Sequence, residues 1–255
     1  MTSADGTRIA YHQTGDGPVV VIVNGAMSRA VDAAGLADAL ADAGFRAVTW
    51  DRRARGDSGD APGSTPEREA QDLAAVIDAV GHDAAVLGHS SGAVLALYAA
   101  SLGVPVRALF LSEPPLRFGV GEPAGDLAER LQRFVDEGHP EDAITTFQLE
   151  NVGLPREMVE AMCASEQFAD LVPLAQSTVY DTNLVMAVST PTPEMLAVDA
   201  PITVLRGEQT FPMLITASDR LAAEIDRAEL VIVPESVMHR PDPAATARVV
   251  SERLG

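Results

Sequence analysis

The feature that most constrains this chain is a glycine-rich turn between an apolar run and a helix-like segment. The turn is Gly88-His89-Ser90-Ser91-Gly92, with the apolar run at residues 83–87 and helical spacing over residues 93–102. A serine at the centre of so sharp a strand-to-helix turn projects its hydroxyl from the end of a sheet, where side-chain carbons two residues to either side would collide. Glycine at both of those positions removes the collisions. The pattern predicts a strained turn that presents Ser90, and a glycine-rich turn with an incidental serine is the less favoured interpretation.

Short apolar runs alternate with helix-like segments along most of the chain. Residues 19–23 are five consecutive β-branched aliphatics, which suits a strand buried on both faces. We expect strands over residues 8–13, 19–23, 47–51, 84–87, 108–111, 202–206 and 230–233. Helices are expected over residues 32–43, 66–80, 93–102, 212–227 and 243–254. This alternation predicts an α/β fold, with a mostly parallel sheet flanked by helices.

One long interval, from residue 114 to about residue 200, interrupts the alternation. It contains no convincing strand, but helical spacing occurs over residues 125–137, 141–151, 156–164 and 167–188. An insertion of this size between two strands is best explained as a helical cap over the carboxyl edge of the sheet. We therefore predict an α/β core of residues 1–114 and 200–255 with a helical cap of residues 115–199.

The charged residues and the single cysteine limit the chemistry. All 18 basic residues are arginine, and the absence of lysine excludes a Schiff base, a P-loop lysine and a Ser-Lys dyad. With 37 acidic residues the net charge is −19, which argues against nucleic acid or an anionic membrane as a partner. Cys163 alone allows neither an internal disulfide nor a multi-cysteine metal site. Residues 1–17 show no signal-peptide pattern and no apolar run is long enough to span a bilayer, so we expect a cytoplasmic protein.

A serine hydroxyl becomes an effective nucleophile beside a general base, which an acidic residue must orient. Among the five histidines, His239 lies in a loop after the last expected strand, where it can reach a serine at the sheet edge. Serine, acid, histidine is also the chain order found with this type of strand–turn–helix motif. We therefore predict Ser90 as the nucleophile and His239 as the base.

These residues make the chain resemble the α/β-hydrolase superfamily over nearly its whole length. The resemblance is supported by Val23-Asn24-Gly25-Ala26 after an early strand and by Trp-Asp-Arg-Arg-Ala-Arg-Gly-Asp-Ser-Gly at residues 50–59. It implies an eight-stranded type of sheet, a helical cap, a Ser-acid-His triad and no cofactor, and we expect no metal. It also implies a structural turn at Arg52, Arg53 and Arg55, which we favour over an anion site.

The acid of the triad departs from the usual pattern of this superfamily. Relatives usually carry an aspartate where this chain has Thr210, in the sequence Gly207-Glu208-Gln209-Thr210. Some relatives carry the acid one strand earlier, where this chain has Glu113 at a strand end, followed by two prolines. We predict that Glu113 orients His239, with Glu208 as the alternative.

The developing oxyanion needs backbone donors. We predict the N–H groups of Ser91, directly after the nucleophile, and of Ala26, in the loop after residues 19–23. Relatives often have His-Gly at this bend where this chain has Asn24-Gly25. We expect the asparagine amide to support the loop instead.

The expected activity is that of a cofactor-independent serine hydrolase, which cleaves a carboxylic ester or lactone through an acyl-enzyme on Ser90. Apolar residues of the expected cap favour a neutral, apolar small-molecule substrate: Phe134, Phe147, Met158, Met162, Phe168, Leu171, Leu184 and Met186. A C–C bond hydrolase and a cofactor-free haloperoxidase-type enzyme are alternatives on the same fold. A non-catalytic ligand-binding protein is a third alternative, favoured by Thr210 in place of the aspartate and disfavoured by the intact Ser90 turn and His239.

Overall fold

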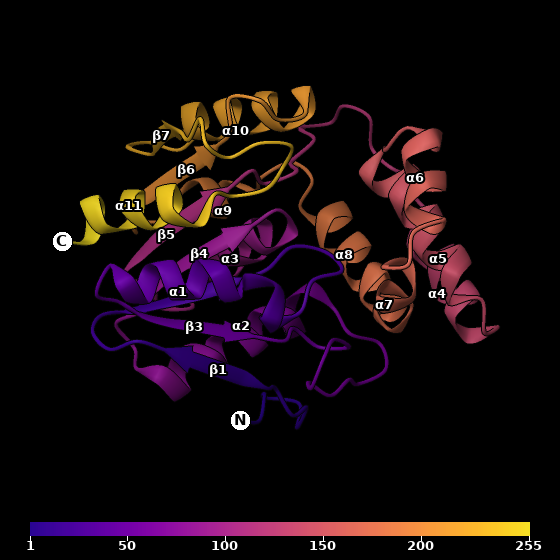
Figure 1. Cartoon of the computed structure of the whole chain (residues 1–255), viewed down its shortest axis with the longest axis horizontal. Coiled ribbons are helices and arrows are strands. Elements are labelled where there is room, and N and C mark those ends of the chain that lie inside the picture. The colour runs from indigo at the N-terminus through magenta and orange to yellow at the C-terminus, as the bar shows by residue number, and fades with distance from the viewer.

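The expected strand sequences form one seven-stranded sheet (Figure 1). The computed structural model describes residues 1–255. Its strands are β1 (Tyr11–Thr14), β2 (Val19–Val23), β3 (Arg46–Trp50), β4 (Ala85–His89), β5 (Ala108–Ser112), β6 (Ile202–Arg206) and β7 (Glu229–Ile232). Their order is β1-β3-β2-β4-β5-β6-β7, and every neighbouring pair is parallel except β1 and β3. The predicted fold class, a mostly parallel sheet flanked by helices, is confirmed.

The expectation of eight strands is wrong, because the N-terminal residues do not add a strand. They form only an isolated antiparallel bridge between Thr2 and Arg8. The chain reverses between these two residues through Gly6, at a φ of 89°. The first strand accordingly begins at Tyr11, three residues later than residue 8.

Alternate side chains of each central strand enter two different cores. In β2, Val21 and Val23 pack into one cluster, whereas Val20 and Ile22 pack into the other. The first core lies against α2 (Pro66–Val80), α3 (Ser91–Ser101) and α10 (Pro212–Glu224). The second lies against α1 (Ala34–Asp42) and α11 (Pro243–Leu254), with the short 3₁₀ turn η1 (Ala30–Ala33) preceding α1. Since both faces of the sheet are covered at its centre, the central strand β2 is a continuous apolar run.

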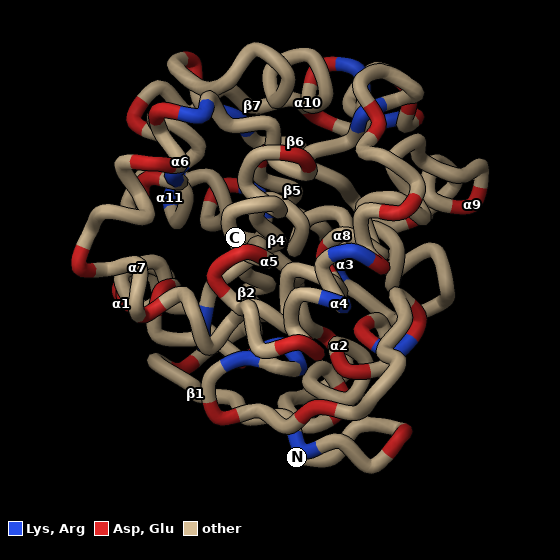
Figure 2. Tube along the Cα trace, turned by 90° about the vertical axis from the view of Figure 1, so that its right-hand side faces the viewer, with Lys and Arg blue, Asp and Glu red and all other residues tan.

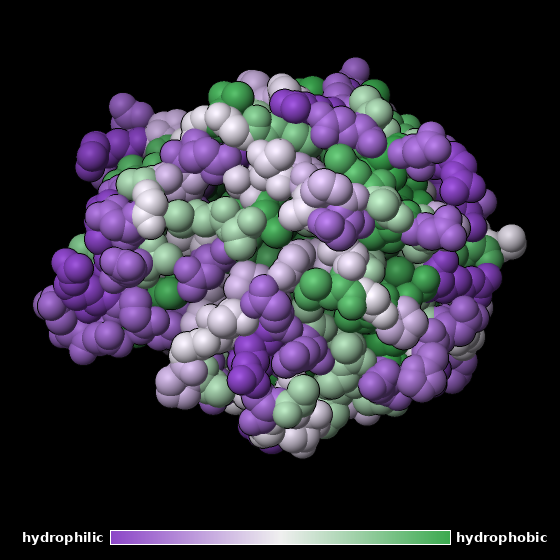
Figure 3. Space-filling model, turned by 180° about the vertical axis from the view of Figure 1, so that it is seen from behind, coloured by the Kyte–Doolittle hydropathy of each residue, from purple (hydrophilic) through white to green (hydrophobic).

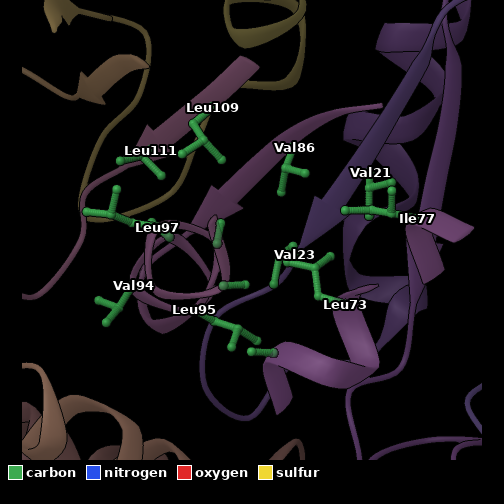
Figure 4. Close-up of a cluster of buried hydrophobic side chains, with 14 of the residues drawn as sticks. Val21, Val23, Leu73, Ile77, Val86, Val94, Leu95, Leu97, Leu109 and Leu111 are labelled. Atoms are coloured by element: carbon green, nitrogen blue, oxygen red, sulfur yellow. The ribbon is translucent and has the colours of Figure 1, made fainter. Parts of the chain in front are cut away.

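Figure 4 shows the first of these cores. Side chains from three parallel strands meet those of α2 and α3 there, and all of the labelled residues are at most 1% exposed. The labelled residues are Val21, Val23, Leu73, Ile77, Val86, Val94, Leu95, Leu97, Leu109 and Leu111. This packing fixes α3 against β4 and β5, so the turn between β4 and α3 rests on a rigid base.

Only helices occur between β5 and β6. They are α4 (Leu127–Asp136), α5 (Pro140–Thr146), a π-helical segment η2 (Phe147–Val152), α6 (Arg156–Cys163), α7 (Phe168–Leu171), a 3₁₀ turn η3 (Val172–Leu174), α8 (Ala175–Ala187) and α9 (Pro193–Leu196). Helices α4 to α7 lie beyond one end of the strands, with α8 between them and α3 (Figure 1). The division into a core of residues 1–114 and 200–255 and a cap of residues 115–199 stays a prediction.

Two expected helices of this region are interrupted. The helix expected over residues 141–151 changes to π geometry at Phe147, a change that often accompanies a functional site. The helix expected over residues 167–188 is divided at Pro173, because a proline ring removes a helical hydrogen bond and clashes with the preceding turn. The helices expected over residues 66–80 and 243–254 are confirmed to the residue.

The acidic residues are spread over the surface. Figure 2 shows red segments scattered across the face that carries the inserted helices, with fewer blue ones. No group of three or more His, Cys, Asp or Glu side chains is arranged to hold a metal ion.

The face of the molecule that is turned away from the viewer in Figure 1 carries hydrophilic side chains around smaller hydrophobic areas (Figure 3). None of the helices is both long enough and apolar enough to cross a membrane.

Candidate active site

Ser90 occupies a strained turn between β4 and α3. Its backbone has φ 54° and ψ −127°, a region that non-glycine residues rarely adopt. A Cβ on Gly88 would lie 2.5 Å from the Cα of Ala93, and one on Gly92 would overlap the carbonyl group of Val23. The glycine spacing of the pentapeptide is therefore a steric requirement of this turn. The strain is held because β4 and α3 are both anchored in the core.

Strand register brings further candidate residues to the same edge of the sheet. In the ladders, Val23 pairs with Gly88 and His89 pairs with Ser112. The residues that follow β2, β4 and β5 are therefore neighbours, although they are far apart in the sequence. Gly25 shows how close they come, since a Cβ there would lie only 2.8 Å from the Cβ of Ser90.

His239 lies in the loop that follows β7, and its imidazole is joined to Glu113. The distance from His239 Nδ1 to Glu113 Oε2 is 2.5 Å. The backbone N–H of Met238 donates to the carbonyl oxygen of Gln209 at 2.8 Å, which ties the loop to the end of β6. His239 and Ser90 line the same cavity, without a direct hydrogen bond between them. Such contacts are often long in unliganded enzymes and tighten when a substrate binds.

Glu113 is held by two further donors. The backbone N–H of Gly207 donates to Oε1 at 2.8 Å, and the Thr210 hydroxyl donates to Oε2 at 3.0 Å. Thr210, which replaces the usual aspartate, thus supports the Glu113 carboxylate directly after β5. The structure brings Ser90, His239 and Glu113 to one edge of the sheet, whereas the Glu208 side chain is exposed and has no hydrogen bond or ion pair to His239.

The pKa values of Glu113 and His89, the two titratable neighbours of His239, both lie below their ordinary values. Burial raises the pKa of Glu113, but the hydrogen bonds from His239, Gly207 and Thr210 and the charge of His239 outweigh burial and hold that pKa below its usual value. The His89 ring packs against the His239 ring, with centroids 4.5 Å apart and planes tilted by 42°. Burial and the charge of His239 lower the pKa of His89 to about 3. Glu113 is therefore an anion and His89 a neutral ring at neutral pH.

The two expected oxyanion donors flank Ser90. Ser91 is the first residue of α3, so its N–H has no acceptor within the helix. Ala26 follows β2 and lines the cavity together with Ser90 and Ser91. The expected support from asparagine is confirmed, because Asn24 Nδ2 donates to the carbonyl oxygen of Arg29 at 2.7 Å across the loop.

Three buried arginines lie behind this loop. Arg53 binds Asp72 through two hydrogen bonds of 2.7 and 2.8 Å. Arg52 binds Glu69 at 2.7 Å, and both Arg52 and Arg55 bind Asp181 of α8, at 2.9 and 2.6 Å. Since carboxylates compensate all three guanidinium groups, the favoured structural interpretation of this cluster is consistent with the contacts, and the anion-site alternative has no free cation to support it.

A cavity of about 470 Å³ opens beside Ser90. Most of the apolar cap residues that were expected to face a substrate pack elsewhere, since Leu184 belongs to the main core and Met158 is 43% exposed. Of that set only Phe147 lines the cavity. The other apolar walls are Pro115, Val152, Leu154, Pro155, Val185, Phe211, Pro212, Met213 and Leu214.

Three polar residues of the cavity were missed by sequence reasoning. Asp181 is a helix residue with no motif around it, and Arg117 and Asn151 lie in the expected cap, where only apolar residues were expected to contact a substrate. Arg117 donates to the carbonyl oxygens of Gly121 and Asn151 and has no carboxylate partner. Asn151 is 7% exposed, and its side-chain oxygen has no hydrogen-bond partner. No local sequence signal distinguishes these residues from ordinary surface polar groups.

Comparisons with known proteins agree with this fold. A family model described as "Alpha/beta hydrolase family" matches residues 20–249. An alpha/beta hydrolase from Sphaerobacter thermophilus DSM 20745 superimposes with a TM-score of 0.92 at 37% identity, over 100% of this chain and 99% of that one.

More distant structures have the same fold. A hydrolase from Pseudomonas aeruginosa PA01 has a TM-score of 0.75 at 21% identity, over 100% of this chain and 97% of that one. The enol-lactonase from Burkholderia xenovorans LB400 has a TM-score of 0.68 at 19% identity, over 98% and 96%. At these identities the likeness concerns the fold alone. No curated protein matches the chain.

Proposed function

The chain belongs to the alpha/beta hydrolase family, and on that premise we propose that it is a cofactor-independent serine hydrolase of carboxylic esters or lactones. The observation that carries the proposal is the Glu113–His239 pair, joined at 2.5 Å beside the cavity that Ser90 lines. An acid-oriented histidine beside a serine on a strained turn is the arrangement that acyl transfer requires.

In the proposed reaction, Ser90 Oγ attacks the carbonyl carbon while His239 Nε2 removes the hydroxyl proton. Glu113 accepts the hydrogen bond from Nδ1, which keeps the other ring nitrogen free to act as the base. The negative charge that forms on the carbonyl oxygen is bound by the N–H groups of Ala26 and Ser91. When the tetrahedral intermediate collapses, His239 returns the proton to the leaving alkoxide. Water then repeats the sequence on the acyl-enzyme and releases the acid.

The cavity supports a small substrate with an apolar acyl or alcohol group. Its volume of about 470 Å³ falls within the range of small-molecule sites, and most of its lining is apolar. Phe147 and Val185 come from the inserted helices, and Met213 and Leu214 from α10. Changes in these four side chains are expected to alter the preferred chain length before they alter the chemistry.

The non-catalytic alternative rested on the missing aspartate at position 210. Because the Thr210 hydroxyl donates to Glu113 at 3.0 Å, the substitution fits a triad whose acid has moved to the end of β5. That arrangement favours catalysis over simple binding.

The test is intact-mass analysis after exposure to an alkyl fluorophosphonate, with Ser90→Ala as the matched variant. We expect one adduct on the parent protein and none on the variant, followed by turnover of neutral esters and lactones. A parent protein that is folded by circular dichroism, and yet forms no adduct and cleaves no ester, would contradict the proposal and favour the binding protein.

A further inference from the structure

We propose that a buried ion network centred on Asp181 positions both oxyanion donors, so that Arg55, Asp181 and the Ser91 side chain are positioning residues for the reaction. The inference rests on the proposed function, because it concerns the N–H groups of Ala26 and Ser91. It links each of these donors to a single carboxylate that belongs to the inserted helix α8.

The first link runs through the peptide group between Gly25 and Ala26. Arg55 Nη1 donates to the carbonyl oxygen of Gly25 at 2.7 Å. That carbonyl and the N–H of Ala26 belong to one planar trans peptide, so they point in opposite directions. A guanidinium bound to the oxygen therefore sets the direction of the N–H. It also polarises the peptide, which strengthens the N–H as a donor.

The second link runs through the side chain of Ser91. Its hydroxyl donates to Asp181 Oδ1 at 2.7 Å, and Arg52 Nη1 lies 3.1 Å from the same hydroxyl. Ser91 is the first residue of α3, and its own N–H is the second expected donor. Holding its side chain limits rotation of this residue relative to Ser90.

Asp181 joins the two links. Arg55 Nη2 binds its Oδ2 at 2.6 Å, while Ser91 binds its Oδ1. Arg52 binds Oδ1 at 2.9 Å and Glu69 at 2.7 Å, which balances two guanidinium groups with two carboxylates. All four ionic side chains are at most 2% exposed. Removing one member would leave its buried partner uncompensated, which favours a single geometry of the network.

A neighbouring pair offers a matched control. Arg53 and Asp72 are as deeply buried, and Arg53 is adjacent to Arg52 in the same segment. Their hydrogen bonds run to each other and to Asp5, and neither side chain has a hydrogen bond to residues 24–26 or to Ser91. Removing this pair thus tests the cost of a broken buried ion pair without disturbing the oxyanion donors.

Charge and geometry give opposite expectations for one of the variants. Asp181→Asn removes a negative charge behind the site, which on charge alone would favour an oxyanion and raise kcat. Arg55→Met removes a positive charge and on charge alone would lower kcat. If the network acts by positioning, both substitutions lower kcat. The loss of transition-state stabilisation in the double variant then does not exceed the sum of the losses in the two single variants.

The experiment measures kcat and KM on one neutral ester, and Ki for a trifluoromethyl ketone, whose hemiketal oxygen occupies the oxyanion site. The variants are Asp181→Asn and Arg55→Met, with Arg53→Met and Asp72→Asn as controls and active sites counted by fluorophosphonate. In the first pair we expect kcat to fall about 10- to 100-fold with KM within about twofold, since a displaced donor costs less than a deleted one. Ki should rise by the same factor. In the controls, kcat per active site and Ki should stay within about twofold.

Two further measurements keep the inference open to refutation. Ser91→Ala removes one link without removing a charge, and we expect a smaller loss of kcat, about 5- to 10-fold, even if the charge variants fail to fold. The ¹⁵N order parameter of the Ala26 amide should fall from about 0.85 to below about 0.6 in Arg55→Met, a readout that needs no turnover. Unchanged kcat, Ki and order parameters in folded variants would overturn the inference, as would a rise of kcat in Asp181→Asn. A parent that forms no fluorophosphonate adduct would instead refute the proposed function.

Discussion

Replacing Glu113 by glutamine changes one charge at the end of β5 and keeps the shape of the side chain. Oε1 accepts from the Gly207 N–H at 2.8 Å, and Oε2 accepts from the Thr210 hydroxyl at 3.0 Å and from His239 Nδ1 at 2.5 Å. An amide has only one oxygen. If that oxygen stays on the Gly207 N–H, the NH₂ group faces His239, and Nδ1 must then accept a hydrogen bond.

This reversal places the proton of the neutral imidazole on Nε2, where the base must instead be free. Loss of the correct tautomer in a serine-protease triad costs about 10⁴-fold in kcat, which corresponds to about 5.5 kcal/mol. The opposite amide orientation leaves the Gly207 N–H facing an NH₂ group, and an unsatisfied buried donor costs about 1–3 kcal/mol. We therefore expect kcat to fall by about 10⁴-fold and the free energy of unfolding to fall by at most about 3 kcal/mol.

The assay compares kcat of the parent, Glu113→Gln and Glu208→Gln on one activated ester, with urea unfolding of all three proteins. Glu208 is exposed and has no hydrogen bond to the site, so its variant should keep kcat within about twofold. A folded Glu113→Gln protein that retains more than about a tenth of the parent kcat would refute the tautomer argument. Loss of kcat in Glu208→Gln alone would move the acid to the loop after β6.

Three further outcomes are expected. Gly25→Ala places a methyl carbon 2.8 Å from the Cβ of Ser90, so fluorophosphonate labelling should slow by at least about 100-fold, whereas Gly35→Ala, with no atom nearer than 3.8 Å, should leave it unchanged. Between the ordinary His pKa of 6.5 and the value of about 3 for His89, the unfolded chain binds more protons than the folded one. The free energy of unfolding should therefore fall as pH falls through that window, and His89 contributes at most about 1.4 kcal/mol per pH unit to this fall. Urea unfolding of His89→Gln across the same pH range should lack this contribution. Arg117 lines the cavity and has no carboxylate partner, so its guanidinium is placed to bind a carboxylate at the far end of a substrate. Arg117→Gln should then lower kcat/KM about 10-fold more for an ester with a distal carboxylate than for a neutral ester of equal length. Equal losses for the two esters would contradict this carboxylate-binding role.

Much of the fold was predictable because its signals are local. Five β-branched residues in a row, Val19–Val23, form a strand buried on both faces, and the helices at residues 66–80 and 243–254 begin where a proline suits the first turn. The turn at Ser90 was predictable for the same reason. Its glycines clash with their immediate neighbours if they carry a Cβ, so the constraint is contained within a few residues.

The acidic residue of the triad was harder to predict from the sequence, because its identity depends on which side chains meet across the sheet. Glu113 and His239 are 126 residues apart, and they meet because the ends of β5 and β7 lie on either side of β6. The sequence left Glu113 and Glu208 as alternatives. Only the fold showed that Thr210 donates to the former and that the latter is exposed.

The sequence by itself determined the sheet, its helices and the strained serine turn, since these follow from side-chain periodicity and from sterics between near neighbours. The tertiary structure alone decided which charged groups surround that turn. Asp181 carries no motif and lies 90 residues from Ser91, and Arg117 lies in a segment without regular structure. Both are significant only because the inserted helices return to the edge of the sheet. Contacts of this kind depend on how packed elements are oriented in space, which residue spacing along one segment does not encode.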